Sequence, residues 1–327
     1  MKVQTFTTNL TRKERIEWVD IAKGMSIILV VLGHTRFSEI PFIGNWFGAF
    51  RMPFFFFVSG LLFNPLKNSH FRPFLSKKSK TLLRPFYIFS VIVLLGYASI
   101  GFGLKDQVEK VLRYGWLGYA LWFIPILLLT NLLYFGVCKI FKTNANRLIG
   151  IIILGTLGCL SDKLNMPNYW NICFSLTAVF FYGLGNLLAP YLISTFKSSI
   201  KRVWILALVC LLISLGFLLN DKPEFFVNEL GKPGLTHIVA IAGTIMMCCF
   251  AFCLARIDNI ILTQTKRFLI YYGKNSYVVL AFHQILILSL VYFLPSLPKV
   301  LTYIIMWTLV TVLIEVINRK VPFILGR

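Results

Sequence analysis

The sequence predicts an all-α protein that crosses a membrane about ten times, and three observations indicate this fold class. Hydrophobic residues make up 57% of the 327 residues, and the mean hydropathy is +0.77. Only 14% of the residues are charged, whereas a soluble domain averages roughly a quarter. Runs of about 20 apolar residues recur along the chain, and each could cross a bilayer core of ~30 Å as a helix.

The apolar runs give ten candidate spans, which are 19–36, 45–64, 84–103, 117–137, 147–161, 170–190, 203–219, 236–255, 274–294 and 299–317. Charged residues and helix breakers gather in the connectors, as in 67–80 and 220–234. Residues 10–18 are expected to form a short surface helix, and no signal peptide precedes the first span. Without repeats or long linkers, residues 1–327 are expected to form one membrane-embedded domain without an appended soluble domain.

The net charge of +21 is mainly a topology signal. With the N-terminus in the cytoplasm, the cytoplasmic connectors and tails hold 22 Lys and Arg residues and the outer connectors hold 7. This positive-inside bias predicts that both termini are cytoplasmic. The distribution argues against a nucleic-acid partner, and a phosphate-binding cytoplasmic face with a basic loop at 67–84 is the secondary interpretation.

The first span carries the most informative residue, His34. An ionisable group at membrane depth is costly and is a functional candidate, and imidazole moves protons near neutral pH. Lys23 lies eleven residues earlier, roughly 16 Å along a helix axis at ~1.5 Å per residue. A cation near one face and a potential base near the other suit a long anionic cofactor. Asp20 can pair with Lys23 one turn later, and a local salt bridge remains the alternative for this pair.

The second span contains Arg51, which is permanently charged and must face the protein interior or water. Pro53 removes a backbone hydrogen bond and bends the helix beside it. We therefore expect a cavity between the first two spans, with Arg51 near His34. Ser59 and Gly60 indicate a close contact with a neighbouring helix.

Basic and aromatic residues also mark the starts of the third and fourth spans. Lys80 and Arg84 precede Pro85 and are either phosphate ligands or ordinary cytoplasmic anchors. Trp122 is either a functional donor or part of an interfacial aromatic belt.

The ninth span opens on three polar residues, Lys274, Asn275 and Ser276, and continues to His283. A buried histidine that hydrogen-bonds a carbonyl across helices is the commoner outcome for His283, and a role in the site is the alternative. The seven cysteines show no metal-ligand spacing with the four histidines, so no metal is expected. No Walker loop or Gly-rich dinucleotide turn is present in the sequence.

Together these residues resemble the acyltransferase-3 family of integral membrane acyltransferases. The resemblance is closest to the branch with fucose 4-O-acetylase-like and enterobacterial-common-antigen-type O-acetyltransferases. The matching pieces follow the family order from residue 18 to about 283, and they are Trp18-x-Asp20-x-x-Lys23-Gly24, Val31-Leu-Gly-His34, the run from Arg51 to Gly60, Leu83-Arg84-Pro85, Leu121-Trp122-Phe123, and Gly273 to Tyr277 with His283.

The resemblance implies transfer of an acyl group, most often acetyl, from cytoplasmic acetyl-CoA to a hydroxyl of a cell-envelope saccharide or lipid-linked saccharide in the bacterial inner membrane. His34 would then be the general base or a transient acyl carrier. Arg51 and Trp122 would stabilise the oxyanion. The CoA phosphates would be bound by Lys23, Lys80, Arg84 and Lys274, with supporting roles for Asp20, Ser59, Asn275, Ser276 and His283.

Two departures from the family pattern bear on this interpretation. Lys23 stands where many members have arginine, so a bidentate phosphate clamp is lost there. Many members also carry an extracytoplasmic esterase-like domain, whereas this chain ends at Arg327, so the membrane domain is expected to complete the transfer alone.

The alternative function is a proton-coupled transporter or flippase for a lipid-linked saccharide. Such a carrier would show inverted repeats and paired broken helices in both halves. Here the unusual polar residues crowd into the first four spans, which favours the enzyme. A catalytically inactive family member that acts as a binding partner is a third possibility, and intact His34 and Arg51 argue against it.

Overall fold

A computed structural model describes residues 17–35, 40–68, 70–116, 119–161, 163–221, 223–225, 227–257 and 259–326. Helices account for the regular structure of this part, apart from one isolated bridge between Glu224 and Glu229. Seven described helices are long and apolar enough to cross a membrane, namely Phe71–Ser99, Ala120–Ile140, Tyr169–Phe196, Ile200–Leu219, Pro233–Arg256, Ser276–Phe293 and Lys299–Lys320. Asn144–Cys159 is a shorter apolar helix. The prediction of an all-α, polytopic membrane protein is confirmed.

Each predicted span corresponds to a helix, and these are α1 (Glu17–Leu32), α2 (Pro41–Leu61), α4 (Arg84–Ser99), α6 (Phe123–Ile140), α7 (Asn144–Cys159), α8 (Ile172–Ser198), α9 (Ile200–Ser214), α10 (Pro233–Arg256), α12 (Ser276–Phe293) and α13 (Lys299–Lys320). Helices α1 and α2 fall outside the seven. The first has only 16 residues, and polar Asn45 and Arg51 lower the hydropathy of the second. Most of the surface helix predicted at 10–18 lies outside the described residues, and Trp18 belongs to α1.

Three helices lie where connectors were predicted, and they are α3 (Phe71–Lys78), α5 (Leu104–Tyr114) and α11 (Ile260–Lys274). A π-helical segment, Ser79–Leu83, joins α3 to α4 without a break. The third membrane helix therefore begins at residue 71, and the predicted start at 84 is wrong. The lysines of α3 resemble a loop in composition, but a long helix can carry such cations near its end.

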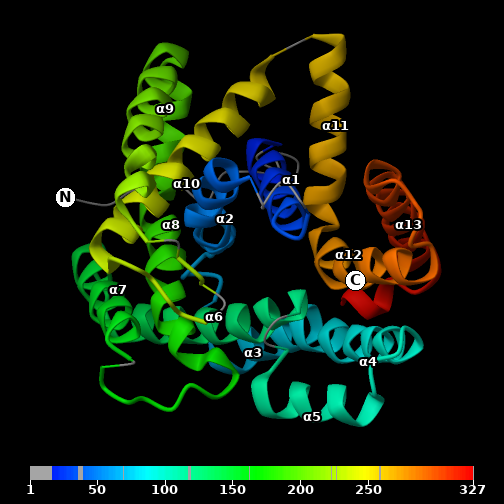
Figure 1. Ribbon diagram of the computed structural model, residues 1–327. Coiled ribbons are helices and arrows are strands. Elements are labelled where there is room, and N and C mark those ends of the chain that lie inside the picture. The colour runs from blue at the N-terminus through cyan, green and yellow to red at the C-terminus, as the bar shows by residue number, and fades with distance from the viewer. Residues whose placement is uncertain are drawn as a thin grey trace.

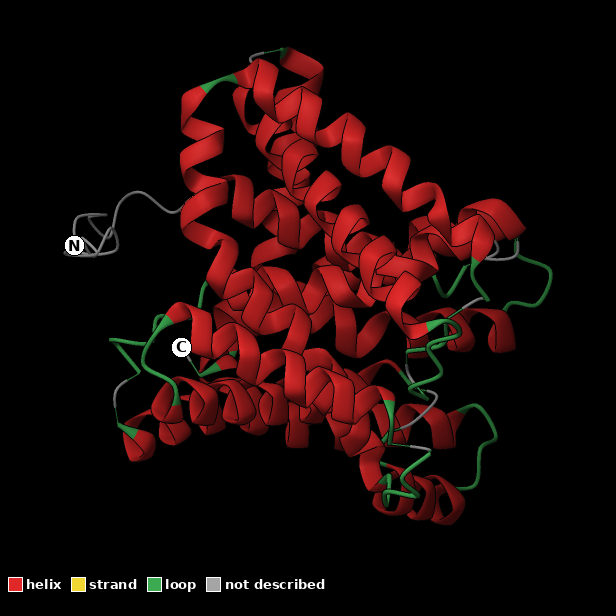
Figure 2. Ribbon diagram, turned by 90° about the vertical axis from the view of Figure 1, so that its left-hand side faces the viewer, coloured by secondary structure: helices red, strands yellow, loops and turns green. Residues whose placement is uncertain are grey.

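Helices α1 and α2 occupy the centre of the molecule (Figure 1). Helix α1 packs against α2, α10, α11 and α12, while α2 packs against α8 and α10. Helices α4, α6 and α12 run across the lower part of the view, at a steep angle to α9 and α11. Figure 2 shows the same two groups from the side, with the loops confined to helix ends.

Glycines let the central helices approach their neighbours at backbone distance. A side chain at Gly24 of α1 would collide with the Leu269 carbonyl of α11, and one at Gly273 would collide with the Asp20 carbonyl. Gly60 of α2 lies equally close to the backbone of Tyr182 in α8, which confirms the helix contact predicted there. These contacts fix the position of α1 and α2 relative to their neighbours.

Candidate active site

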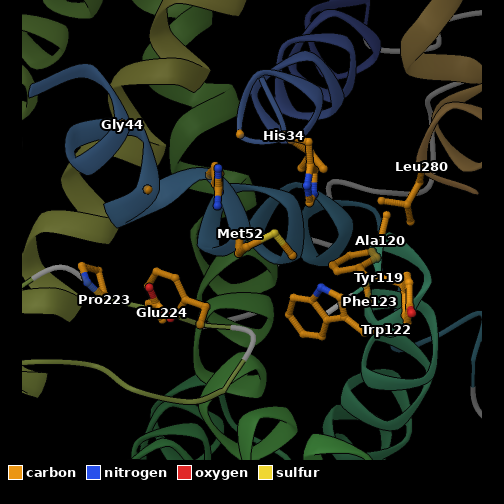
Figure 3. A pocket seen from close by; sticks show the side chains of 15 residues that line it. His34, Gly44, Met52, Tyr119, Ala120, Trp122, Phe123, Pro223, Glu224 and Leu280 are labelled. Atoms are coloured by element: carbon orange, nitrogen blue, oxygen red, sulfur yellow. The ribbon is translucent and has the colours of Figure 1, made fainter. Parts of the chain in front are cut away.

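His34 lies on the turn that ends α1. The helix stops at Leu32, and the His34 and Thr35 amides donate to the carbonyls of Val31 (2.9 Å) and Leu32 (3.0 Å). The predicted span continued to residue 36, so the helix is shorter than expected. Because α1 ends there, the imidazole is exposed and projects into a cavity instead of packing along the helix (Figure 3).

The cavity around His34 has a volume of about 270 Å³. It is lined by the end of α1, the face of α2, the segment that begins α6, a loop before α10 and Leu280 of α12. Its polar lining residues are His34, Arg51, Tyr119, Trp122 and Glu224. Three of the site residues predicted from the sequence, His34, Arg51 and Trp122, thus line one cavity.

Arg51 lies in this cavity beside the end of α1. A side chain at Gly33 would collide with the Arg51 Nη1 atom, so the guanidinium packs against the residue next to His34. Within the described part of the chain, the guanidinium makes no side-chain hydrogen bond. Among the described residues, Glu224 lines the same cavity, and its carboxylate interacts with Arg51 electrostatically. The donors of Arg51 are therefore available to a ligand.

Trp122 is held in the cavity wall by a short 3₁₀-helix, Ala120–Trp122. The first amide of that helix, at Ala120, donates to Gln284 Oε1 of α12 (2.7 Å). Tyr119, directly before it, donates its hydroxyl to Gln107. The Trp122 ring is buried, and its indole nitrogen lies on the edge that faces His34 (Figure 3). Trp122 is therefore part of the cavity and does not form a belt at the surface.

The ring of His283 packs beside the ring of His34, and the two ring centroids are 5.1 Å apart. Its Nδ1 donates to the carbonyls of Val279 (2.8 Å) and Leu280 (3.1 Å), which leaves Nε2 as the unprotonated nitrogen. The ring is fully buried, and Nε2 has no hydrogen-bond partner within the described residues. Both carbonyls belong to α12 itself, so the predicted bond to a carbonyl of another helix is wrong. The ring instead contacts the candidate base.

A second cavity, of about 170 Å³, adjoins the first, and Phe123 and Leu280 line both. Lys23 of α1, Ser59 of α2 and Ser276 of α12 meet in its wall. Lys23 and His34 thus line two adjoining cavities, one beside the middle of α1 and one at its end.

The remaining basic residues predicted to bind phosphates do not line either cavity. Lys274 is exposed and directly follows Gly273, which packs on Asp20. Lys80 is exposed in the π-helical segment. Arg84 Nη1 donates to the Phe323 carbonyl (3.1 Å), which ties the C-terminal segment to α4.

Asn275, a predicted supporting residue, stabilises a helix junction. Its side-chain Nδ2 donates to the Tyr271 carbonyl (2.9 Å) at the end of α11, and its Oδ1 accepts from Asn318 Nδ2 of α13 (3.0 Å). The residue therefore links α11, α12 and α13 and does not line either cavity.

A family model for acyltransferase domains, the acyltransferase-3 family, matches residues 16–317. The chain belongs to this family. It is a membrane acyltransferase, with an acyl donor and an acceptor. No curated protein and no solved structure matches the chain.

Two residues of this acyltransferase were missed by the sequence reasoning. The ammonium group of Lys78 in α3 is repelled electrostatically by Lys77 and by Lys23 of α1. Lys78 was assigned to a loop in the sequence, whereas it belongs to a helix that continues into α4. Glu224 lies in the connector predicted at 220–234. Apart from its acidic side chain, nothing in the sequence there distinguishes it as a functional residue.

Across the described residues of the acyltransferase, His, Cys, Asp and Glu do not form a group of three or more that could hold a metal ion. The cavities offer an imidazole, cations and indole or hydroxyl donors. This set is suited to moving a proton and stabilising an anion.

Proposed function

We propose that this acyltransferase moves an acetyl group from cytoplasmic acetyl-CoA to a hydroxyl of a cell-envelope saccharide or glycolipid. We place it in the bacterial inner membrane with both termini in the cytoplasm, as one membrane-embedded acyltransferase domain over residues 1–327. The motif run from Trp18 to His283 supports the fucose 4-O-acetylase-like and common-antigen-type branch of the family.

The observation that carries the proposal is the pair of adjoining cavities. Lys23 lines one and His34 lines the other, and Phe123 and Leu280 border both. A CoA thioester is long, with an anionic phosphate head and a thin arm. Such a molecule would extend from Lys23 to His34 with its head on the cationic side and its thioester at the base.

At the His34 end, the reaction needs a base for an acceptor hydroxyl whose pKa lies far above neutral. His34 takes that proton as the hydroxyl oxygen attacks the thioester carbonyl. The guanidinium of Arg51 and the indole N–H of Trp122 donate to the developing oxyanion. When the tetrahedral intermediate collapses, the C–S bond breaks and the CoA sulfur receives the proton from the imidazolium. Transfer of the acetyl group through His34 itself is the alternative route.

At the Lys23 end, the ammonium groups of Lys23 and Lys78 interact electrostatically. Repulsion between Lys23 and Lys78 is relieved when an anion binds between them. Lys80, Arg84 and Lys274 extend the positive charge around the same end of α1 and complete the proposed phosphate site. Asp20, Ser59, Asn275, Ser276 and His283 support these groups.

The test is transfer by purified protein. Radiolabelled acetyl-CoA and envelope saccharides are incubated with the protein in detergent, and label in the saccharide fraction is counted. Time-dependent O-acetylation that is removed by mild base is the expected result. A transporter would leave the saccharides unlabelled in detergent, where no membrane separates two compartments, and that result would overturn the enzyme proposal.

A further inference from the structure

The N-terminal half of α2 presents an unusually bare face to the His34 cavity. Gly44 and Gly48 lie one turn apart on this face, followed by Arg51 and Met52 one turn later. A Cβ added at Gly48 would meet no atom within 4 Å. Gly48 therefore leaves a trough in the cavity wall, which Gly44 also lines. Gly48 does not allow a neighbouring helix to pack closely, because no atom lies near it. Its lack of a side chain instead keeps the trough open.

The opposite wall of the trough is the loop that carries Pro223, Glu224 and Phe225. In Figure 3 Pro223 and Glu224 lie on the same side of the cavity as Gly44, away from Trp122. The Glu224 backbone is paired with Glu229 (N···O distances of 2.7 and 3.2 Å). Its carboxylate is half-buried and, among the described residues, has no side-chain hydrogen bond.

Two residues that follow Glu224 in the chain, Phe225 and Asn228, anchor the loop. Phe225 is buried against Phe174 (ring centroids 5.9 Å apart). Asn228 has a left-handed backbone (φ 64°), and its side chain donates to the Gly158 carbonyl (2.9 Å) and accepts from Thr177 (3.0 Å). A fixed loop that presents an unbonded carboxylate to a cavity is preorganised for a ligand.

The chemistry of the trough indicates which ligand it takes. Glu224 accepts hydrogen bonds and Arg51 donates them from the facing wall, as the hydroxyls of a sugar require. Beyond Pro223 a further cavity of about 150 Å³ continues the trough, with Asn45 and Asp221 in its lining. A lipid chain would not match these groups. The groove lined by Leu132, Gly136 and Ile153, on the α6–α7 surface, is the apolar type that a lipid chain fits.

We infer that the trough between Gly48 and Glu224 is the acceptor site of this acyltransferase. It binds an oligosaccharide or glycolipid headgroup, with the acylated hydroxyl at His34 and Glu224 as a specificity-determining residue. The inference rests on the proposed function and adds where the acceptor binds. Because the trough continues past Pro223, sugar units next to the acylated one contribute to binding.

The experiment separates acceptor binding from donor binding in four variants of the full chain. Gly48→Leu fills the trough, and Gly136→Leu is its control, because Gly136 is equally free of contacts but lies on the α6–α7 surface. Glu224→Gln removes the carboxylate, and Glu229→Gln removes the same charge from the other side of the loop. Acetyl-CoA binding is measured by equilibrium dialysis, and transfer is measured to envelope glycans fractionated by size.

Gly48→Leu is expected to lose transfer at least tenfold while it binds acetyl-CoA as the wild type does. Glu224→Gln should raise the apparent KM for the glycan about tenfold, the effect of one hydrogen bond to a charged group. The two controls should match the wild type, and oligosaccharide fractions should be better acceptors than monosaccharides.

Wild-type transfer by Gly48→Leu, weaker acetyl-CoA binding by Glu224→Gln, or equal effects of Glu224→Gln and Glu229→Gln would overturn the inference. If Gly48→Leu fails to fold, which loss of acetyl-CoA binding reveals, Glu224→Gln decides alone. A different result would contradict the proposed function, namely that the wild type labels no glycan at all. That result would also contradict the acceptor site, which rests on the proposed function.

Discussion

The two ends of α1 are built in opposite ways. Near Lys23 the helix touches α11 backbone to backbone, through Gly24 at Leu269 and Gly273 at Asp20. Near His34 the helix has ended, and its last side chains border an open cavity of about 270 Å³. The comparison teaches that tight packing near Lys23 holds the helix in place. His34 can therefore lie beyond the last helical turn and still be positioned in the cavity.

The largest effect is expected at the open end. His34→Ala should lower turnover by roughly 10²–10⁴-fold, the usual contribution of one general base. Because the imidazole is exposed in the cavity, its removal should leave the fold and acetyl-CoA binding unchanged. Single-turnover transfer and acetyl-CoA binding check this. Wild-type turnover by the purified variant would remove His34 from the mechanism.

The second largest effect is expected from substitutions of Arg51 and of Gly33, which packs against its guanidinium. Arg51→Lys keeps the charge but loses the planar donors, and loss of one oxyanion donor costs on the order of 10²–10³-fold. Gly33→Ala should impair transfer in the same way, because its methyl group displaces the guanidinium. Thermal unfolding should change little in either variant. If Gly33→Ala is fully active, the observed position of Arg51 is not the reactive one.

At the closed end the effect should be on stability. Gly24→Ala puts a methyl group against the Leu269 carbonyl, which cannot move aside as a side chain can. Overpacking of this kind costs about 1–3 kcal/mol. A lower unfolding temperature in detergent is expected, whereas Gly136→Ala, at a site without close neighbours, should not lower it. Equal stability of the two variants would contradict the tight contact between α1 and α11.

The smallest effect is expected from single lysines at the donor end. Lys23→Gln and Lys78→Gln should each weaken acetyl-CoA binding about tenfold, and less so at high salt because screening already weakens these interactions. Arg84→Gln should weaken binding less, because its guanidinium already donates to Phe323. Affinities unchanged in all three variants would refute the phosphate site.

The sequence predicted those parts of the site that follow from the free-energy cost of burying an ionisable side chain in a membrane. An arginine and a histidine in apolar helices must share a polar cavity, and Arg51 and His34 do so. The helical class and most span positions followed from hydropathy, which acts locally along the chain.

The rest depends on contacts between distant segments. Helix α11 contains both apolar and polar residues, so its sequence alone does not show where it packs. Its position is set by the glycine contacts with α1. Lys78 and Lys23 interact electrostatically although they lie on different helices, α3 and α1. Glu224 enters the cavity through a loop anchored by Phe225 and Asn228, so its role was not visible in a connector.

The most direct test of the central claim is a cryo-EM structure of the protein with a thioether analogue of acetyl-CoA. The claim is that the donor lies along α1, with its two ends in the two cavities. We expect the phosphates beside Lys23 and Lys78 and the acetyl group beside His34 and Arg51, with the trough at Gly48 still open. An analogue whose phosphates lie beside Glu224, or whose acetyl group does not contact His34, would contradict the account.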